Sequence, residues 1–201
     1  MNPSALTSEF VSAGVGTFFR PKDIRPLGMS FRELQRLVGS GAVEKVAPGL
    51  YRLSSVEPTE LESVATICAA VPGAIICLLS ALAMHVIGTQ LPHQIWIAID
   101  RKARRPTRLP YPVRVMRFSG PMLRYGIVTR EALGVRIRVT SPARTVVDCF
   151  RYRNKVGLDV AMEALRDAVR SRKATVDEIV RAAEVCHAAT VVSPYLEALS
   201  A

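Results

Sequence analysis

Residues 28–53, which read GMSFRELQRLVGSGAVEKVAPGLYRL, contain the signals that decide the fold of the amino-terminal part of this chain. Ser30 and Glu33 have the spacing of a capping box, in which a serine and a glutamate satisfy each other's free backbone amides at a helix start. Apolar residues then recur at helical spacing up to Gly39. We therefore predict a helix that begins after Ser30 and buries one face. That face consists of Phe31, Leu34, Leu37 and Val38.

A shorter helix is predicted upstream, at residues 22–27. Pro21 suits its first turn, because the amide that proline lacks has no helical partner there. Gly28 tolerates the left-handed conformation that ends such a helix. Two short helices joined by Gly-Met-Ser have the layout of a helix-turn-helix. A helix before both of them is predicted from the spacing of Leu6, Phe10 and Val11.

The polar side of the helix after Ser30 presents Arg32, Gln35 and Arg36. The amino-terminal part of the second helix in a helix-turn-helix meets base edges in the major groove. Arginine pairs with guanine, and glutamine with adenine, through two hydrogen bonds each. We therefore predict that these three side chains, with Ser30 at the helix start, form a surface that reads DNA sequence.

A β-hairpin is predicted directly after this helix. Residues 43–46 and 50–53 are rich in strand-forming side chains and flank a Pro-Gly turn. A hairpin in this position is the wing of a winged helix-turn-helix, and Lys45 and Arg52 are placed on it to contact phosphates. Residues 1–55 are therefore predicted to form a winged helix-turn-helix DNA-binding domain.

The charge of the chain favours an anionic partner. The 201 residues have a formal net charge of +10 and 49% hydrophobic content, enough for a well-packed core. The excess is uneven: residues 1–55 carry +3, whereas residues 95–140 carry eleven basic and two acidic side chains. Most of the positive charge therefore lies outside the predicted winged helix.

Residues 56–201 are predicted to form a second, α+β domain. Its strands are expected at residues 94–99, 112–118 and 135–139, where apolar and polar residues alternate. We predict a small antiparallel sheet with one wet face, followed by carboxy-terminal helices. The predicted helices are one capped at Thr59 and Glu62 that ends near Ala70, then residues 80–87 and 158–170, one capped at Thr175, and one that starts at Ser193-Pro194.

The basic residues of this domain have three competing interpretations. They could hold the DNA backbone, bind an acidic or nucleotide-bearing protein, or form a solvated loop that guards a sheet edge. The register that would place strand arginines together on the wet face is not defined by the sequence. The residues of this secondary basic patch are Arg101, Lys102, Arg104, Arg105, Arg114, Arg136 and Arg138.

Arg144 is predicted to lie buried in a hydrogen-bonded position. Ser141-Pro142 marks a helix start, so Arg144 falls in the first turn, where the helix dipole disfavours a cation. Asp148 lies one turn later and could pair with it. We favour a structural clamp between helix and sheet over contact with a ligand.

Several functional classes are not favoured. The histidines His85, His93 and His187 are scattered without metal-binding spacing, and the strand region offers only Asp100 and Glu131 to a metal-dependent nuclease. We therefore expect a protein that is not an enzyme, with no metal, no cofactor and no membrane segment. The four cysteines form no CxxC pair and are expected to be buried free thiols, which fits a cytoplasmic location.

The stretch at 28–53 resembles the winged-helix domain of AbiEi-type antitoxins, the regulators of type IV toxin–antitoxin systems. Three later stretches resemble the same family's second domain: CLLSALAMHV at 77–86, QIWIAID at 94–100, and residues 140–170. The resemblance implies a repressor that binds inverted repeats upstream of its own operon. It also implies that the protein counters a nucleotidyltransferase-type toxin, without a need for direct contact. At Gly39-Ser40 and Ala47-Pro48, where relatives often carry basic residues, this chain carries none.

Two alternatives to an antitoxin remain open from the residues. One is a transcription factor whose second domain senses a small ligand, and the other is a nucleic-acid-processing enzyme built on the basic sheet. Because the winged helix lacks some basic residues, we also predict that the second domain supplies much of the non-specific DNA affinity. The winged helix would then supply the choice of sequence.

Overall fold

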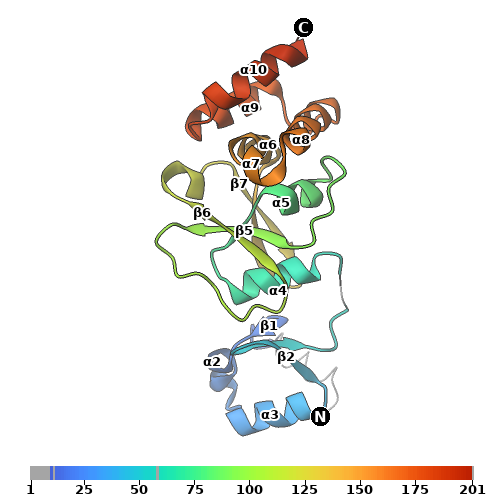
Figure 1. Cartoon of the computed structure of the whole chain (residues 1–201). Helices are drawn as coiled ribbons and strands as arrows, with labels where there is room; N and C mark the ends of the chain where they lie inside the picture. The colour runs from blue at the N-terminus through green and yellow to red at the C-terminus, as the bar shows by residue number, and fades with distance from the viewer. Residues whose placement is uncertain (1–9, 11, 58, 201) are drawn as a thin grey trace. The chain divides into compact units, whose positions relative to one another are not determined.

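The computed structural model describes residues 10, 12–57 and 59–200 (Figure 1). The contacts divide the chain into two compact units. The first comprises residues 1–72, 106–111 and 130–137, and the second comprises residues 73–105, 112–129 and 138–201. The domain boundary predicted after residue 55 stays a prediction.

The first unit contains the predicted helix-turn-helix and hairpin. The helices are α2 (Pro21–Ile24), continued by the 3-10 turn η1 (Arg25–Leu27), and α3 (Phe31–Gly39). Between them Gly28 has a φ of 74°, the left-handed conformation expected of a helix stop. The wing strands are β2 (Val43–Ala47) and β3 (Leu50–Leu53).

A third strand that the sequence analysis did not predict completes the wing sheet. β1 (Phe18–Phe19) pairs antiparallel with β3, which gives the strand order β1-β3-β2. The two phenylalanines of β1 follow a glycine-rich stretch in which apolar and polar residues do not alternate. The sequence around them therefore does not predict a strand, and β1 is identified only by its pairing with β3. Of the first predicted helix, Leu6 and Val11 lie outside the described residues, while Phe10 is fully buried.

Aromatic rings and aliphatic side chains form the core of this unit. Phe10 packs edge-on against Phe19 with ring centroids 5.1 Å apart, and Phe19 stacks on Tyr51 at 6.0 Å. Leu34 of α3 is fully buried among them. The prediction that Phe31 belongs to the buried face is wrong, because its side chain is 62% exposed. As the first residue of α3, it lies at the end of the helix, beyond the turn that packs on the core.

Helix α4 (Glu62–Ala70) begins later than predicted. The capping box expected at Thr59 does not form, and the residue at the helix start is Leu61, which makes no side-chain cap. The Glu62 carboxylate, which was to close that box, instead pairs with the Arg52 guanidinium. Glu62 therefore forms an ion pair with a residue of β3 instead of a cap at the start of its own helix. The predicted end of this helix at Ala70 is confirmed.

The second sheet has five strands in the order β6-β5-β4-β8-β7. β4 pairs antiparallel with β5, but β4 with β8 and β5 with β6 are parallel. The predicted mixture of helices and strands is confirmed, yet this sheet is mixed rather than antiparallel. Residues 101–112 form a crossover between parallel strands, not a hairpin. The strands are β4 (Ile75–Ile76), β5 (Ile95–Asp100), β6 (Val113–Phe118), β7 (Ile127–Ala132) and β8 (Val135–Thr140).

The predicted wet face is not found at the centre of this sheet, where β4, β5 and β8 lie side by side. Ile75, Ala98 and Arg138 share one face by register, and Ile76, Ile97 and Val139 share the other. The five apolar residues among these six are all fully buried. Helices α5 (Leu78–His85) and α6 (Pro142–Arg151) pack on the first of these faces. The alternation in β5 and β8 therefore does not indicate one solvated face, because both faces are buried at these central positions.

The carboxy-terminal helices surround α6 (Figure 1). The predicted helix at 158–170 is confirmed, and so is the cap at Thr175. The last helix begins at Ala189 rather than at Ser193, and Pro194 lies inside it. Fully buried Val192 explains the earlier start, since packing on the core favours helix before the proline. These helices are α7 (Arg153–Val156), α8 (Leu158–Arg170), α9 (Val176–Val185) and α10 (Ala189–Ser200).

Candidate nucleic-acid interface

Helix α3 presents the predicted base-reading side chains to solvent. Arg32, Gln35 and Arg36 are all exposed, while Leu34 on the opposite side is fully buried. Arg32 and Arg36 are one turn apart, so the two guanidinium groups lie on the same side of the helix. The arrangement offers fixed donors on a rigid element, as readout in a major groove requires.

Ser30 has a structural role at the start of α3. Its hydroxyl accepts from the Glu33 amide at 3.2 Å and donates to the Glu33 carboxylate at 2.7 Å. That carboxylate also accepts from the Ser30 amide at 2.7 Å. These bonds, with the Ser30 hydroxyl first, lower the pKa of Glu33. The hydroxyl predicted to contact DNA therefore already has its donor engaged within the cap.

The two wing cations lie in different surroundings. Lys45 on β2 is exposed. Arg52 on β3 is 8% exposed, pairs with Glu62, and donates to the Val56 carbonyl at 3.0 Å. A phosphate contact by Arg52 would require this buried ion pair to open, which leaves Lys45 as the accessible cation of the predicted pair.

The crossover between β5 and β6 displays the densest group of cations. Its start is held by the Lys102 amide, which donates to Asp100 Oδ1 at 2.7 Å, and by Arg117, which donates to the Ala103 carbonyl at 2.5 Å. The side chains that follow project from an anchored turn and remain free to approach a polyanion. The exposed cations of the crossover are Arg101, Lys102, Arg104 and Arg105 in its first five residues, and Arg108 beyond them.

The three strand arginines of the predicted patch do not add to this group. Arg114 lies over the Trp96 ring at 4.5 Å. Arg138 donates to the carbonyls of Gly73 at 3.3 Å and Leu123 at 3.1 Å. Arg136 is exposed, but it falls in the other compact unit. The structure thus brings together the crossover cations and assigns local roles to Arg114 and Arg138.

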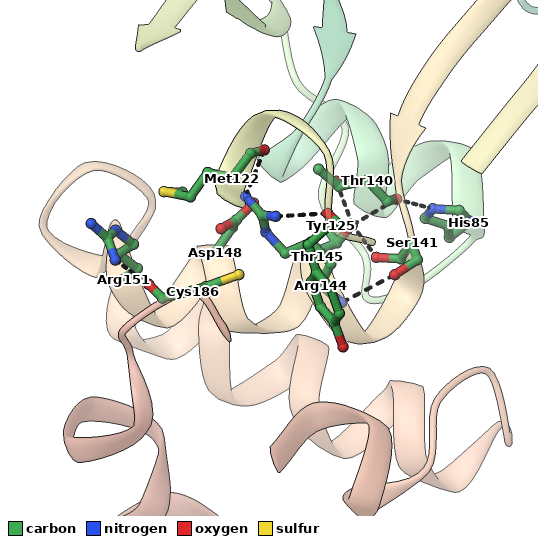
Figure 2. Close-up of polar contacts among 10 residues, drawn as sticks. All are labelled: His85, Met122, Tyr125, Thr140, Ser141, Arg144, Thr145, Asp148, Arg151 and Cys186. Atoms are coloured by element: carbon green, nitrogen blue, oxygen red, sulfur yellow. Dashed lines mark hydrogen bonds and ion pairs between the residues drawn. The ribbon is translucent and has the colours of Figure 1, made fainter. Parts of the chain in front are cut away.

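Arg144 is the centre of a buried polar network in the second unit (Figure 2). Its side chain is fully buried, and its Nε donates to Asp148 Oδ2 at 2.9 Å. The two terminal nitrogens donate to the Tyr125 carbonyl at 2.9 Å and the Met122 carbonyl at 3.4 Å. The guanidinium therefore joins α6 to the segment after β6. The predicted burial and the Asp148 pair are confirmed, whereas the predicted clamp between helix and sheet reaches the segment between β6 and β7 rather than a strand.

Gly126 makes room for this clamp. It has a φ of 58°, and a Cβ there would lie 2.8 Å from Cβ of Arg144.

A second group of hydrogen bonds holds the end of β8, which leads into α6. His85 Nε2 donates to the Thr140 carbonyl at 2.7 Å, and the Thr145 hydroxyl donates to the same carbonyl at 3.1 Å. Sequence patterns did not identify these partners, because most of them are backbone carbonyls.

The acid of the buried pair has an unusual environment. Asp148 Oδ1 has no hydrogen-bond partner, and Asp148 is fully buried. Burial raises the pKa of Asp148 to about 6, although Arg144 acts in the opposite direction. Burial likewise raises the pKa of the Cys77 and Cys149 thiols. All four cysteines are buried and free, as the sequence analysis predicted.

Comparison with known proteins gives a family match for the segment that contains α3 and the wing. Residues 9–54 match a family described as AbiEi antitoxin, transcriptional regulator. This segment is similar to the AbiEi antitoxin transcriptional regulators. The match confirms the resemblance read from residues 28–53, and the matched segment contains α3 and the wing strands β2 and β3. No curated protein gives a significant match to the chain.

Two further observations concern other classes of site. Within residues 10, 12–57 and 59–200, no group of three or more His, Cys, Asp or Glu side chains is placed to hold a metal ion. In the same described part of the chain, no helix is long and apolar enough to cross a membrane.

Proposed function

We propose that this protein is a DNA-binding antitoxin that represses its own operon by binding inverted repeats in its operator. The observation that carries the proposal is the exposed side of α3. Three strong hydrogen-bond donors lie on the first two turns of a helix whose other side fills the core of the segment that is similar to AbiEi antitoxins. Such a surface suits base readout in a major groove.

The proposal assigns phosphate binding to residues outside α3. Lys45 on the wing contributes one accessible cation, and the crossover contributes Arg101, Lys102, Arg104 and Arg105. Phosphate contacts provide affinity without sequence preference. The crossover would therefore supply much of the non-specific affinity, and α3 would supply the choice of operator.

The regulator is further proposed to counter a nucleotidyltransferase-type toxin in the cytoplasm without binding it directly. This part rests on the family match of residues 9–54. We propose no catalytic activity for the chain itself. Co-expression with a nucleotidyltransferase-type toxin tests the antitoxin role: this protein should rescue growth, and failure of rescue would contradict it.

The DNA-binding role is tested by the salt dependence of binding to duplex DNA. Each phosphate contact contributes about −0.9 to the slope of log K against log salt concentration. Replacing Arg101, Lys102, Arg104 and Arg105 by Ala should flatten the slope by up to ~4 × 0.9. The ratio of operator to random-sequence affinity should stay nearly unchanged, because these contacts do not read bases.

A matched control removes the same charge from another exposed surface. Lys155, Arg166, Arg170 and Arg181 are exposed on α7, α8 and α9, and their replacement by Ala should leave the slope unchanged. Equal flattening by both variants would assign the effect to net charge alone. A quadruple crossover variant that binds operator normally but fails to rescue cells would assign the crossover to antitoxicity instead.

A further inference from the structure

An aromatic ring on α3 lies in solvent beside the proposed base-reading residues. Phe31 is the first residue of the helix and is 62% exposed. The core-facing side of α3 is already occupied by Leu34, with Leu37 and Val38 packed against the same core. Phe31 is thus an apolar side chain that is not part of the core formed by the described residues of this unit.

The position of Phe31 on the helix gives it polar neighbours. Residues four apart lie one above the other on a helix, so Phe31 and Gln35 share one side, and Arg32 follows directly in the chain. Helical side chains lean toward the amino terminus, so all three extend over the first turn of α3. A groove along the flank of α3 that carries Glu33 and Arg36 is also lined by Leu27 and Met29, and Phe31 does not line it.

We propose that Phe31 contacts the C5-methyl group of a thymine in the major groove, in the base pair whose adenine Gln35 reads or in the next one. The inference rests on the proposed DNA-binding function. In the major groove the thymine methyl is the apolar group that distinguishes an A·T pair, and phenylalanine is suited to contact it. Phe31 would therefore add a preference for thymine that no hydrogen bond supplies.

The test replaces single thymines by deoxyuridine, which removes only the methyl group. Duplexes that the protein binds are first selected from a random pool, and each thymine is then substituted in turn. Each α3 bound to the duplex should have one sensitive thymine. Substitution of that thymine should weaken binding about fourfold, the loss expected for one methyl group (~0.8 kcal/mol). Phe31→Ala should weaken binding to the thymine duplex and abolish this sensitivity, whereas Phe31→Leu should retain it.

A matched control uses an exposed apolar residue of the other unit. Leu91 is 86% exposed, and Leu91→Ala should change neither the affinity nor the deoxyuridine effect. Because Phe31 is exposed, thermal unfolding should show that Phe31→Ala folds as the parent protein does.

The outcomes separate this inference from the proposed function. If the protein selects no duplex at all, the DNA-binding proposal fails. If it selects duplexes but no thymine is sensitive to deoxyuridine, or Phe31→Ala leaves the sensitivity intact, the thymine contact is overturned while DNA binding stands. Equal weakening of every duplex by Phe31→Ala would also overturn it, because the residue would then act without regard to sequence.

Discussion

Helices α3 and α6 start with the same local signal but use their arginines in opposite ways. Each begins after a serine whose hydroxyl accepts from the third helical amide, Ser30 in α3 and Ser141 in α6. Arg36 of α3 is exposed, whereas Arg144 of α6 is fully buried and paired with Asp148. The difference lies in what packs on each helix.

The two arginines differ in what they contribute to binding and to the stability of the fold. A guanidinium on a solvated helix keeps its hydration and its donors free, so it can bind a base or phosphate at little cost to the fold. A buried guanidinium has lost its hydration and depends on every partner it contacts. We therefore expect changes in α3 to affect binding and changes in α6 to affect stability.

The largest effect is expected from Arg144→Ala. The change leaves Asp148 as an uncompensated buried charge, and breaking such pairs costs about 3–5 kcal/mol of unfolding free energy. Urea unfolding measures the loss. The control is Arg166→Ala, an exposed arginine of α8, which should stay within about 0.5 kcal/mol of the parent protein. If Arg144→Ala lost no more unfolding free energy than Arg166→Ala, the proposed difference between the arginines of α3 and α6 would be wrong.

A smaller effect on binding is expected from Arg36→Ala. Losing one bidentate base contact should cost about 1–3 kcal/mol of operator affinity and relax the preference at one base position. Titration of operator variants measures both quantities, and stability should hardly change. If sequence preference survived intact, α3 would not be the recognition helix. Arg166→Ala again serves as the control for loss of one charge.

The pH dependence of stability tests the state of Asp148. Its pKa of about 6 in the folded protein lies above the value of 3.8 for an unperturbed carboxyl, so the folded state binds the proton more tightly. The stability contributed by the protonated form is present below pH 4 and is lost as pH rises through 6, on the order of 3 kcal/mol.

Comparison with Asp148→Asn isolates this contribution. The stability of the parent protein relative to the Asn variant should fall between pH 4 and pH 6.5, because only the parent titrates at this position. A difference that stays nearly flat over this range and falls as pH drops below 4 would show that the Arg144 pair outweighs burial and holds the pKa of Asp148 below its ordinary value.

The smallest effect should be the same in both helices. Ser30→Ala and Ser141→Ala each remove a side-chain acceptor from a helix start, which costs about 1 kcal/mol of unfolding free energy. Thermal or urea unfolding of the two variants measures the costs. A much larger cost for Ser141→Ala would mean that its neighbours in the network around Arg144 depend on it.

Local signals predicted most of the winged helix and the ends of several other elements. The cap of α3, the stop at Gly28, the wing strands and the cap of α9 each depend on residues within four positions of one another. Strand β1 and the parallel pairs of the second sheet could not be predicted in this way. Their pairing joins residues that are distant in the chain, and the alternation in each strand does not specify its direction.

In the candidate interface, too, some features follow from local sequence and others from contacts between distant parts of the chain. The sequence alone determined that Arg32, Gln35 and Arg36 lie opposite Leu34, because helical periodicity places them there. Only the tertiary structure decided that Phe31 is exposed, that Arg52 pairs with Glu62, and that Arg114 and Arg138 are engaged locally. The physical reason is that the hydration of a side chain depends on what covers it, and the covering residues come from elsewhere in the chain.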